Sequence, residues 1–113
     1  MKQIREILVD LYGCEADLDN VDLLVSTLRA ASEHMGSQIV KVISHKFSPT
    51  GTTVFIILAE THMSIHTWPE SKYAALDIFI CDEKINPEIG WKTVKDALRP
   101  SSFKMHEMTR NIP

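Results

Sequence analysis

The chain has 113 residues, enough for one compact domain with a hydrophobic core, and we expect a single domain over residues 1–113. Its net charge is -3 and its basic residues form no stripe, which argues against nucleic acid as a partner. No segment approaches the roughly 20 apolar residues of a membrane span, and the N-terminus lacks the apolar run of a signal peptide, so we expect a cytoplasmic protein.

The two cysteines, Cys14 and Cys81, lie far apart in the sequence. Neither belongs to a CxxC pattern, and no histidine follows at zinc-site spacing. The pattern therefore predicts two free thiols rather than a disulfide framework or a zinc site.

The N-terminal third of the chain has the pattern of a strand followed by a helix. Apolar residues between Ile4 and Tyr12 predict an opening strand, although their spacing also permits a short helix. Residues 17–20 supply capping side chains, and apolar residues then recur at helical spacing until Met35 and Gly36 end the pattern.

Further along the chain, residues 38–47 and 52–58 are rich in β-branched side chains and flank a Ser-Pro-Thr-Gly turn, which predicts a hairpin. Residues 74–81 predict another strand, the pair Asn86-Pro87 begins a helix through Leu98, and residues 103–108 alternate as a last strand. The order β-α-β-β-β-α-β predicts an α+β fold, a two-layer sandwich of a mostly antiparallel sheet with two helices on one face. We expect a partner subunit to cover the other face.

The segment from Glu60 to Glu70, Glu-Thr-His-Met-Ser-Ile-His-Thr-Trp-Pro-Glu, is dense in polar side chains. An unpaired buried hydroxyl or imidazole costs about 1–3 kcal/mol, so a core strand normally avoids such groups. This density indicates a functional site rather than a core strand.

Residues four apart share a face of a strand, so His62, Ser64 and His66 would align with Glu60. One interpretation is a solvent-facing polar stripe. Another is an acid–base cluster in which the His66 imidazole exchanges protons near neutral pH and the Cys81 thiol donates one. A metal site at His62 and His66 lacks a third ligand at suitable spacing.

Cys81 ends an apolar strand, where a lone cysteine is more often a small hydrophobic side chain than a catalytic group. Its neighbour Asp82 disfavours a thiolate by charge repulsion, which suits a protonated acid rather than a nucleophile. The residues alone therefore leave both interpretations open.

With Tyr73-Ala74-Ala75 and Cys81 downstream, the segment from Glu60 to Glu70 closely resembles the short prokaryotic S-adenosylmethionine decarboxylase proenzymes, which are pyruvoyl-dependent. Those proteins carry Glu-Ser-His, Ile-His-Thr-Trp-Pro-Glu, Tyr-Ala-Ala and a cysteine at matching spacing. The resemblance extends to Leu18-Asp19-Asn20 and to His45-Lys46-Phe47, and it covers nearly the whole chain.

The resemblance implies that the chain cuts its own backbone between Glu60 and Thr61, into fragments 1–60 and 61–113. In that family the residue-61 hydroxyl attacks the preceding carbonyl, the ester undergoes β-elimination, and the new N-terminus becomes a pyruvoyl group. This group forms a Schiff base with S-adenosylmethionine and acts as the electron sink for decarboxylation, which yields the aminopropyl donor for spermidine.

The resemblance also assigns roles to individual residues. It implies that His66 is the processing base, Cys81 the proton donor to the product carbon and Thr53 a hydroxyl that assists cleavage. It further implies that Phe47 stacks on adenine and that Glu70 contacts the ribose or substrate. Members of the family are homodimers with active sites at the subunit interface, which fits the uncovered sheet face.

Position 61 departs from the family pattern, because it is Thr where the family has Ser. Processing of Thr61 would give a 2-oxobutyryl group in place of pyruvoyl, and its extra methyl would crowd the Schiff base. β-Branching also stiffens the side chain, and a misplaced oxygen can cost about a hundredfold in rate. Thr53 likewise replaces a serine.

These departures motivate an alternative function, a non-cleaving homologue that binds S-adenosylmethionine or regulates a decarboxylase partner. A third hypothesis keeps the chemistry but changes the substrate to another amino acid, such as arginine or ornithine. Phe47 and Glu70 favour a nucleoside substrate over that hypothesis.

Overall fold

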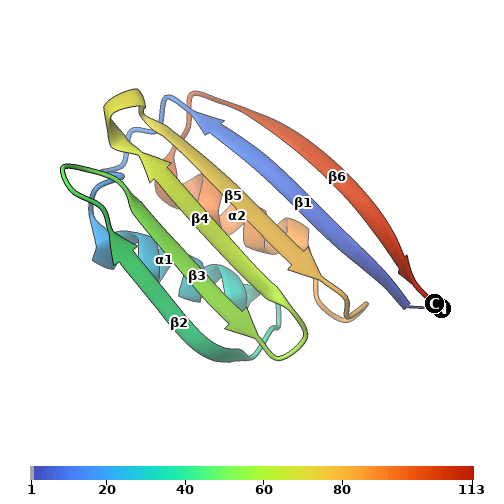
Figure 1. Cartoon of the computed structure of the whole chain (residues 1–113). Helices are drawn as coiled ribbons and strands as arrows, with labels where there is room; N and C mark the ends of the chain where they lie inside the picture. The colour runs from blue at the N-terminus through green and yellow to red at the C-terminus, as the bar shows by residue number, and fades with distance from the viewer. Residues whose placement is uncertain (1) are drawn as a thin grey trace.

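The computed structural model describes residues 2–113, which form a six-stranded sheet and two α-helices (Figure 1). The strands are β1 (Lys2–Tyr12), β2 (Ile39–Lys46), β3 (Thr52–Leu58), β4 (His62–Trp68), β5 (Tyr73–Ile80) and β6 (Ser102–Ile112). The helices are α1 (Val21–His34) and α2 (Pro87–Leu98), and a short 3-10 turn, η1 (Pro69–Ser71), follows β4. The strand order is β2-β3-β4-β5-β1-β6, and every neighbouring pair within residues 2–113 is antiparallel.

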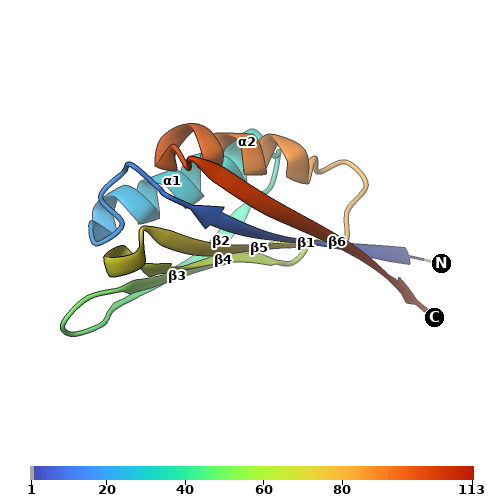
Figure 2. The same cartoon turned by 90° about the horizontal axis from the view of Figure 1, so that it is seen from above.

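Both helices cover one face of the sheet, and the opposite face is left open (Figure 2). Burial alternates along the central strands as a two-layer sandwich requires: in β3, Val54, Ile56 and Leu58 are buried toward the helices, whereas Phe55 and Ile57 point to the open face. The predicted α+β sandwich with both helices on one face is therefore confirmed.

The core lies between the helices and the sheet. Leu24, Leu28 and Ala31 of α1 and Val94 and Leu98 of α2 are fully buried against the apolar face of the strands. Burial of each large aliphatic side chain contributes about 1.5–3 kcal/mol, so this layer stabilises the sheet that carries the open face. Within residues 2–113, neither helix has the length and apolar character needed to cross a membrane.

Local capping explains where the helices begin. The side chain of Asn20 accepts a hydrogen bond from the backbone N–H of Leu23 at 3.1 Å, and that of Asn86 accepts one from Glu88 at 3.1 Å. Pro87 occupies the first turn of α2, where a missing N–H costs no helical hydrogen bond. The predicted helix starts are confirmed.

The fourth strand corrects the predicted element order. The polar content of residues 62–68 argues against a core strand, yet these residues form β4 near the middle of the sheet. Met63, Ile65 and Thr67 are buried under the helices, while His62, Ser64 and His66 alternate onto the open face, where their polar groups meet no apolar layer of the same chain. The five-strand prediction is therefore wrong by one strand.

Candidate active site

The predicted scissile bond lies in the tight turn between β3 and β4. The Leu58 N–H donates to the Thr61 carbonyl at 2.9 Å, and the Ala59 N–H donates to the Gln38 carbonyl at 2.9 Å, so the turn is held on both sides. Cys81 directly follows β5, which pairs with β4. Sheet pairing therefore brings Cys81 to this turn; Glu60, Thr61 and Cys81 are named the cleavage cluster below.

The Cys81 thiol donates a hydrogen bond to the carbonyl oxygen of Glu60, with an Sγ to O distance of 3.0 Å. That oxygen belongs to the peptide bond between Glu60 and Thr61. A donor at this oxygen polarises the carbonyl and would stabilise negative charge that develops there during attack by a nucleophile.

The hydroxyl of Thr61 is shielded from solvent and has no hydrogen-bond partner among the residues that the structure describes. Leaving a buried hydroxyl unpaired costs about 1–3 kcal/mol, and such orphaned groups call for an explanation. A nucleophile that is later consumed in forming a cofactor explains it, since its lone pairs must be free for attack. The site therefore fits a cofactor made from residue 61.

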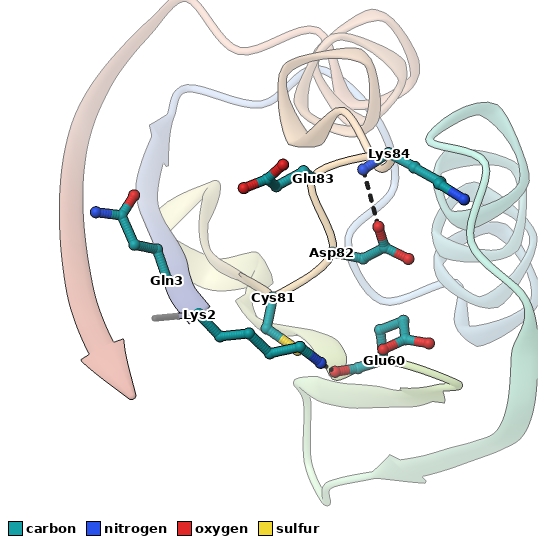
Figure 3. Close-up of a pocket in the computed structure, with 7 residues that line it drawn as sticks. All are labelled: Lys2, Gln3, Glu60, Cys81, Asp82, Glu83 and Lys84. Carbon is teal, nitrogen blue, oxygen red and sulfur yellow. Dashed lines mark hydrogen bonds between the residues drawn. The ribbon is translucent and has the colours of Figure 1, made fainter. Parts of the chain in front are cut away.

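A pocket of about 410 Å³ opens beside the cleavage cluster (Figure 3). Its lining residues are Lys2, Gln3, Glu60, Cys81, Asp82, Glu83 and Lys84. This volume lies within the range of about 300–1,000 Å³ that is typical of small-molecule sites. The lining carries one more carboxylate than ammonium groups, so the pocket favours a ligand with cationic groups.

The other predicted catalytic side chains meet at a second place on the open face. Thr53 of β3 and His66 of β4 are paired across the sheet, and Thr53 Oγ1 lies 2.5 Å from His66 Nδ1. The ring centroids of Phe47 and Trp68 lie 5.4 Å and 4.2 Å from that of His66. Phe47, Thr53, His66 and Trp68 are named the histidine cluster.

Asp19 holds the loop that carries Phe47 in place. The carboxylate of Asp19 pairs with Lys46 and accepts the Gly51 N–H at 3.1 Å. The hydrogen bond from Lys46 and then that from Gly51 hold the pKa of Asp19 below its ordinary value. Gly51 has a φ of +106°, and a Cβ there would lie 3.1 Å from the Thr67 carbonyl, so this turn requires glycine.

Glu70 lies in η1, directly after β4, and its side chain is exposed at the same end of the strand as the histidine cluster. Phe47 is also largely accessible, with 42% of its surface exposed. Both predicted substrate contacts are thus available to a ligand on this side of the molecule.

The two clusters occupy opposite ends of β4. Thr61 immediately precedes the strand and His66 lies five residues further on, a separation of about 16 Å at the usual rise of a strand. The expectation from residue types that His66 and Cys81 form one acid–base cluster is therefore not met within one chain. The cleavage cluster and the histidine cluster are therefore separate within one chain.

His62 does not join His66 in a metal site. Its ring stacks between those of Phe55 and Phe79, with centroid distances of 5.1 Å and 4.8 Å. In the part of the chain that the structure describes, no group of three or more His, Cys, Asp or Glu residues is arranged to hold a metal ion.

Some residues around the two clusters carry no role in the sequence-based prediction. Lys2, Asp82 and Glu83 line the pocket, and Trp68 packs on His66. Trp68 is part of the Ile-His-Thr-Trp-Pro-Glu string that carries the family resemblance, whereas Lys2 lines the pocket because the N-terminal strand β1 pairs with β5. Lys2 is far from Glu60 and Cys81 in the sequence, so sequence spacing alone does not indicate that it lines the same pocket.

Comparison with known proteins identifies the family of the chain. The family model for S-adenosylmethionine decarboxylase matches residues 5–111. The chain is 39% identical over 107 residues to the S-adenosylmethionine decarboxylase proenzyme of Methanococcus aeolicus, covering 94% of this chain and 92% of the relative. It is 37% identical over 110 residues to the proenzyme of the same name from Parasynechococcus marenigrum, covering 96% and 86%.

The crystal structure of the adenosylmethionine decarboxylase from Aquifex aeolicus has the same fold. It superposes with a TM-score of 0.90 at 30% sequence identity, over 99% of this chain and 93% of that one.

Proposed function

The chain belongs to the S-adenosylmethionine decarboxylase family, and we propose that it releases the carboxyl group of S-adenosylmethionine as carbon dioxide through a keto-acyl group made from its own residue 61. The product would be the aminopropyl donor for spermidine. The observation that carries this proposal is the cleavage cluster, in which a thiol donates to the Glu60 carbonyl beside an unpaired Thr61 hydroxyl.

Self-cleavage would begin at Thr61. Its Oγ1 attacks the Glu60 carbonyl carbon, the peptide C–N bond breaks, and the hydroxyl proton passes to the departing nitrogen, which leaves an ester. Cys81 stabilises the charge on the carbonyl oxygen during this step. The N-to-O transfer needs no group outside the chain.

Elimination then completes the cut. His66, supplied as the processing base by the second protomer of the dimer proposed below, removes the Cα proton of Thr61, the Cβ–O bond breaks, and Glu60 leaves as a carboxylate. The resulting enamine tautomerises, and water replaces its nitrogen as ammonia, which gives a 2-oxobutyryl group at the start of the 61–113 fragment. A serine at this position would give pyruvoyl by the same steps.

The keto-acyl group supplies an electron sink for the bond that breaks when carbon dioxide leaves. Thr61 would provide the group, and the Cys81 thiol would return a proton to the product carbon; its contact with the adjacent Glu60 carbonyl oxygen supports this role. The thiol thus serves twice, first as a donor to the scissile carbonyl and later as the acid.

We further propose a homodimer whose active sites form at the subunit interface. Each chain carries the cleavage cluster at one end of β4 and the histidine cluster at the other, so one chain alone cannot bring His66 to Thr61. In a two-fold pair the histidine cluster of one protomer would face the cleavage cluster of its partner, and both sites would be completed together. The open sheet face supports this arrangement, because the half-buried rings of Phe55 and Phe79 lie on that face, where no helix of the same chain packs on them.

The proposed substrate fits the chemistry of the residues around both clusters. Phe47 offers an exposed ring on which an adenine can stack, and Glu70 offers a carboxylate to ribose hydroxyls. The excess of carboxylates in the pocket suits the sulfonium and ammonium charges of S-adenosylmethionine. Arginine and ornithine carry neither an adenine ring for Phe47 nor ribose hydroxyls for Glu70. We place the reaction in the cytoplasm, as the sequence predicts.

A direct test measures labelled carbon dioxide released from carboxyl-labelled S-adenosylmethionine, arginine and ornithine. We expect release from S-adenosylmethionine alone, and its loss in Cys81→Ala. Because cleavage precedes catalysis, each variant is first checked for its two fragments by mass spectrometry. Cleaved protein that releases no carbon dioxide from S-adenosylmethionine would overturn the proposed substrate.

A further inference from the structure

Self-cleavage creates a new carboxylate at the end of the 1–60 fragment, and we propose that this carboxylate stays against the Cys81 thiol and holds it protonated. Glu60 would then be a positioning residue for the proton donor after it has ceased to be part of a peptide bond. The inference rests on the proposed function, and its geometric basis is the 3.0 Å contact between Cys81 Sγ and the Glu60 carbonyl oxygen.

The oxygen that accepts the thiol hydrogen bond survives the reaction. In the acyl transfer the Glu60 carbon keeps its carbonyl oxygen and exchanges the Thr61 nitrogen for Thr61 Oγ1. In the elimination the bond that breaks joins this second oxygen to the Thr61 Cβ, so both oxygens leave with Glu60. The acceptor of the Cys81 hydrogen bond is therefore retained, and it gains negative charge.

The sheet keeps the two fragments together after the cut. In the order β2-β3-β4-β5-β1-β6, the strands β4 and β5 of the second fragment lie between β3 and β1 of the first. Three strand pairs join the first fragment to the second: β3 with β4, β1 with β5, and β1 with β6. Their backbone hydrogen bonds involve no atom of the scissile bond. Separation of the fragments would therefore require dismantling the sheet.

Short connections hold Glu60 and Cys81 near their places. Glu60 follows the buried end of β3 by two residues, and the intervening Ala59 N–H is bonded to the Gln38 carbonyl within the same fragment. Cys81 follows Ile80, which is 2% exposed and is paired with Arg5. Neither anchor depends on the peptide bond that is cut.

A carboxylate acceptor changes the chemistry of the thiol. Hydrogen bonds to a charged acceptor are stronger than those to a neutral carbonyl, and a thiolate beside a carboxylate is disfavoured by repulsion. The ammonium groups of Lys2 and Lys84 and the carboxylates of Asp82 and Glu83 line the same pocket before and after the cut, so the new carboxylate is the charge that cleavage adds there. Cys81 would therefore remain a thiol in the processed protein. A Cys81 thiolate could attack a carbon attached to the substrate sulfonium and expel a thioether, and this side reaction would consume the cysteine. Keeping Cys81 protonated would also prevent that side reaction.

The test compares the alkylation of Cys81 by iodoacetamide in two forms across a range of pH. Thr61→Ala lacks the nucleophilic hydroxyl and stays uncleaved, so its Glu60 oxygen remains a neutral carbonyl. Thr61→Ser supplies the cleaved form. Peptide mapping by mass spectrometry separates the Cys81 signal from that of Cys14, which is buried.

We expect alkylation of Cys81 near neutral pH to be at least about tenfold slower in cleaved Thr61→Ser than in Thr61→Ala, with the half-maximal rate reached at higher pH. Asp82→Asn, made in both backgrounds, is the matched control: it removes a carboxylate that is present in both forms, so the difference between them should persist. A purely structural role of Glu60 would leave the two pH profiles superimposed.

The outcomes separate this inference from the proposed function. Cleaved protein whose profile equals that of Thr61→Ala, or lies at lower pH, contradicts the contact between the carboxylate and the thiol while leaving self-cleavage intact. A Thr61→Ser preparation that stays uncut contradicts both.

Discussion

Thr53 Oγ1 lies 2.5 Å from His66 Nδ1, across the pairing of β3 with β4 on the open face of the sheet. The hydroxyl fixes the orientation of the imidazole, which also packs against the rings of Phe47 and Trp68. Because Nδ1 is engaged by Thr53, proton removal from Thr61 would fall to Nε2. A hydroxyl that assists cleavage can thus act by orienting the base.

Thr53→Val should slow self-cleavage by about 10- to 100-fold, because it keeps the side-chain shape and removes the group that orients His66. The rate is followed as loss of intact chain by mass spectrometry. Thr52→Val is the matched control: Thr52 is buried on the helix face and its Oγ1 has no partner among the described residues, so cleavage should continue at the original rate. Equal rates for both variants would argue against the orienting role.

Thr61→Ser should cleave roughly a hundredfold faster than the Thr61 protein, since serine has less restricted χ1 rotation and no methyl to crowd the elimination. Mass spectrometry of the second fragment should report pyruvoyl in this variant and 2-oxobutyryl in the Thr61 protein. A serine variant that cleaves no faster would mean that Thr61 already holds its oxygen in line for attack.

Variants of the two clusters should complement one another if the site is shared between protomers. His66→Ala and Cys81→Ala homodimers should each be inactive. When both are coexpressed, random pairing makes half of the dimers mixed, and each mixed dimer has one intact site, so about a quarter of full activity should return. A coexpressed mixture as inactive as its parents would indicate a site built within one chain.

Much of the fold follows from local pattern. The range 52–58 and the helix start at Asn86-Pro87 were predictable, because β-branched alternation and capping side chains act within a few residues of one another. The sequence-based prediction missed β4, because its alternating polar side chains are also compatible with a functional loop. Only the open face of the sheet shows where these polar side chains lie.

The site is less predictable from sequence than the fold. The polar composition of the segment around His66 indicates a functional site, and the family resemblance implies roles for its residues. The contact between Cys81 and Glu60 depends on the register of β5 against β4, which pairs Phe79 with His62. The separation of the two clusters depends on residues 62–68 being extended as β4, which the sequence-based prediction did not include.

Tyr73 should ionise late in an alkaline titration. Its hydroxyl donates to Asp10 at 2.5 Å, and this hydrogen bond, followed by burial, raises the pKa of Tyr73 to about 12. The raised pKa means that the bond contributes its full stability below about pH 10, the ordinary tyrosine value, and loses it as pH rises through about 12.

The measurement is the phenolate absorbance of the folded protein against pH, together with unfolding by denaturant at each pH. Tyr73→Phe should lack the late ionisation step, and its free energy of unfolding should fall less steeply between about pH 10 and 12 than that of the parent. If both proteins lose stability in parallel over this range, the hydrogen bond from Tyr73 to Asp10 does not account for the alkaline transition.

The central claim is that the chain makes its cofactor by cutting itself between Glu60 and Thr61, and a denaturing mass spectrum tests it most directly. Freshly purified protein is compared with a sample held for days at working temperature. We predict that the intact 12.8 kDa chain gives way to two fragments, residues 1–60 with a free carboxylate and residues 61–113 with a keto group in place of the N-terminal amine. A chain that stays intact throughout, in the Thr61 protein and in Thr61→Ser alike, would contradict the claim.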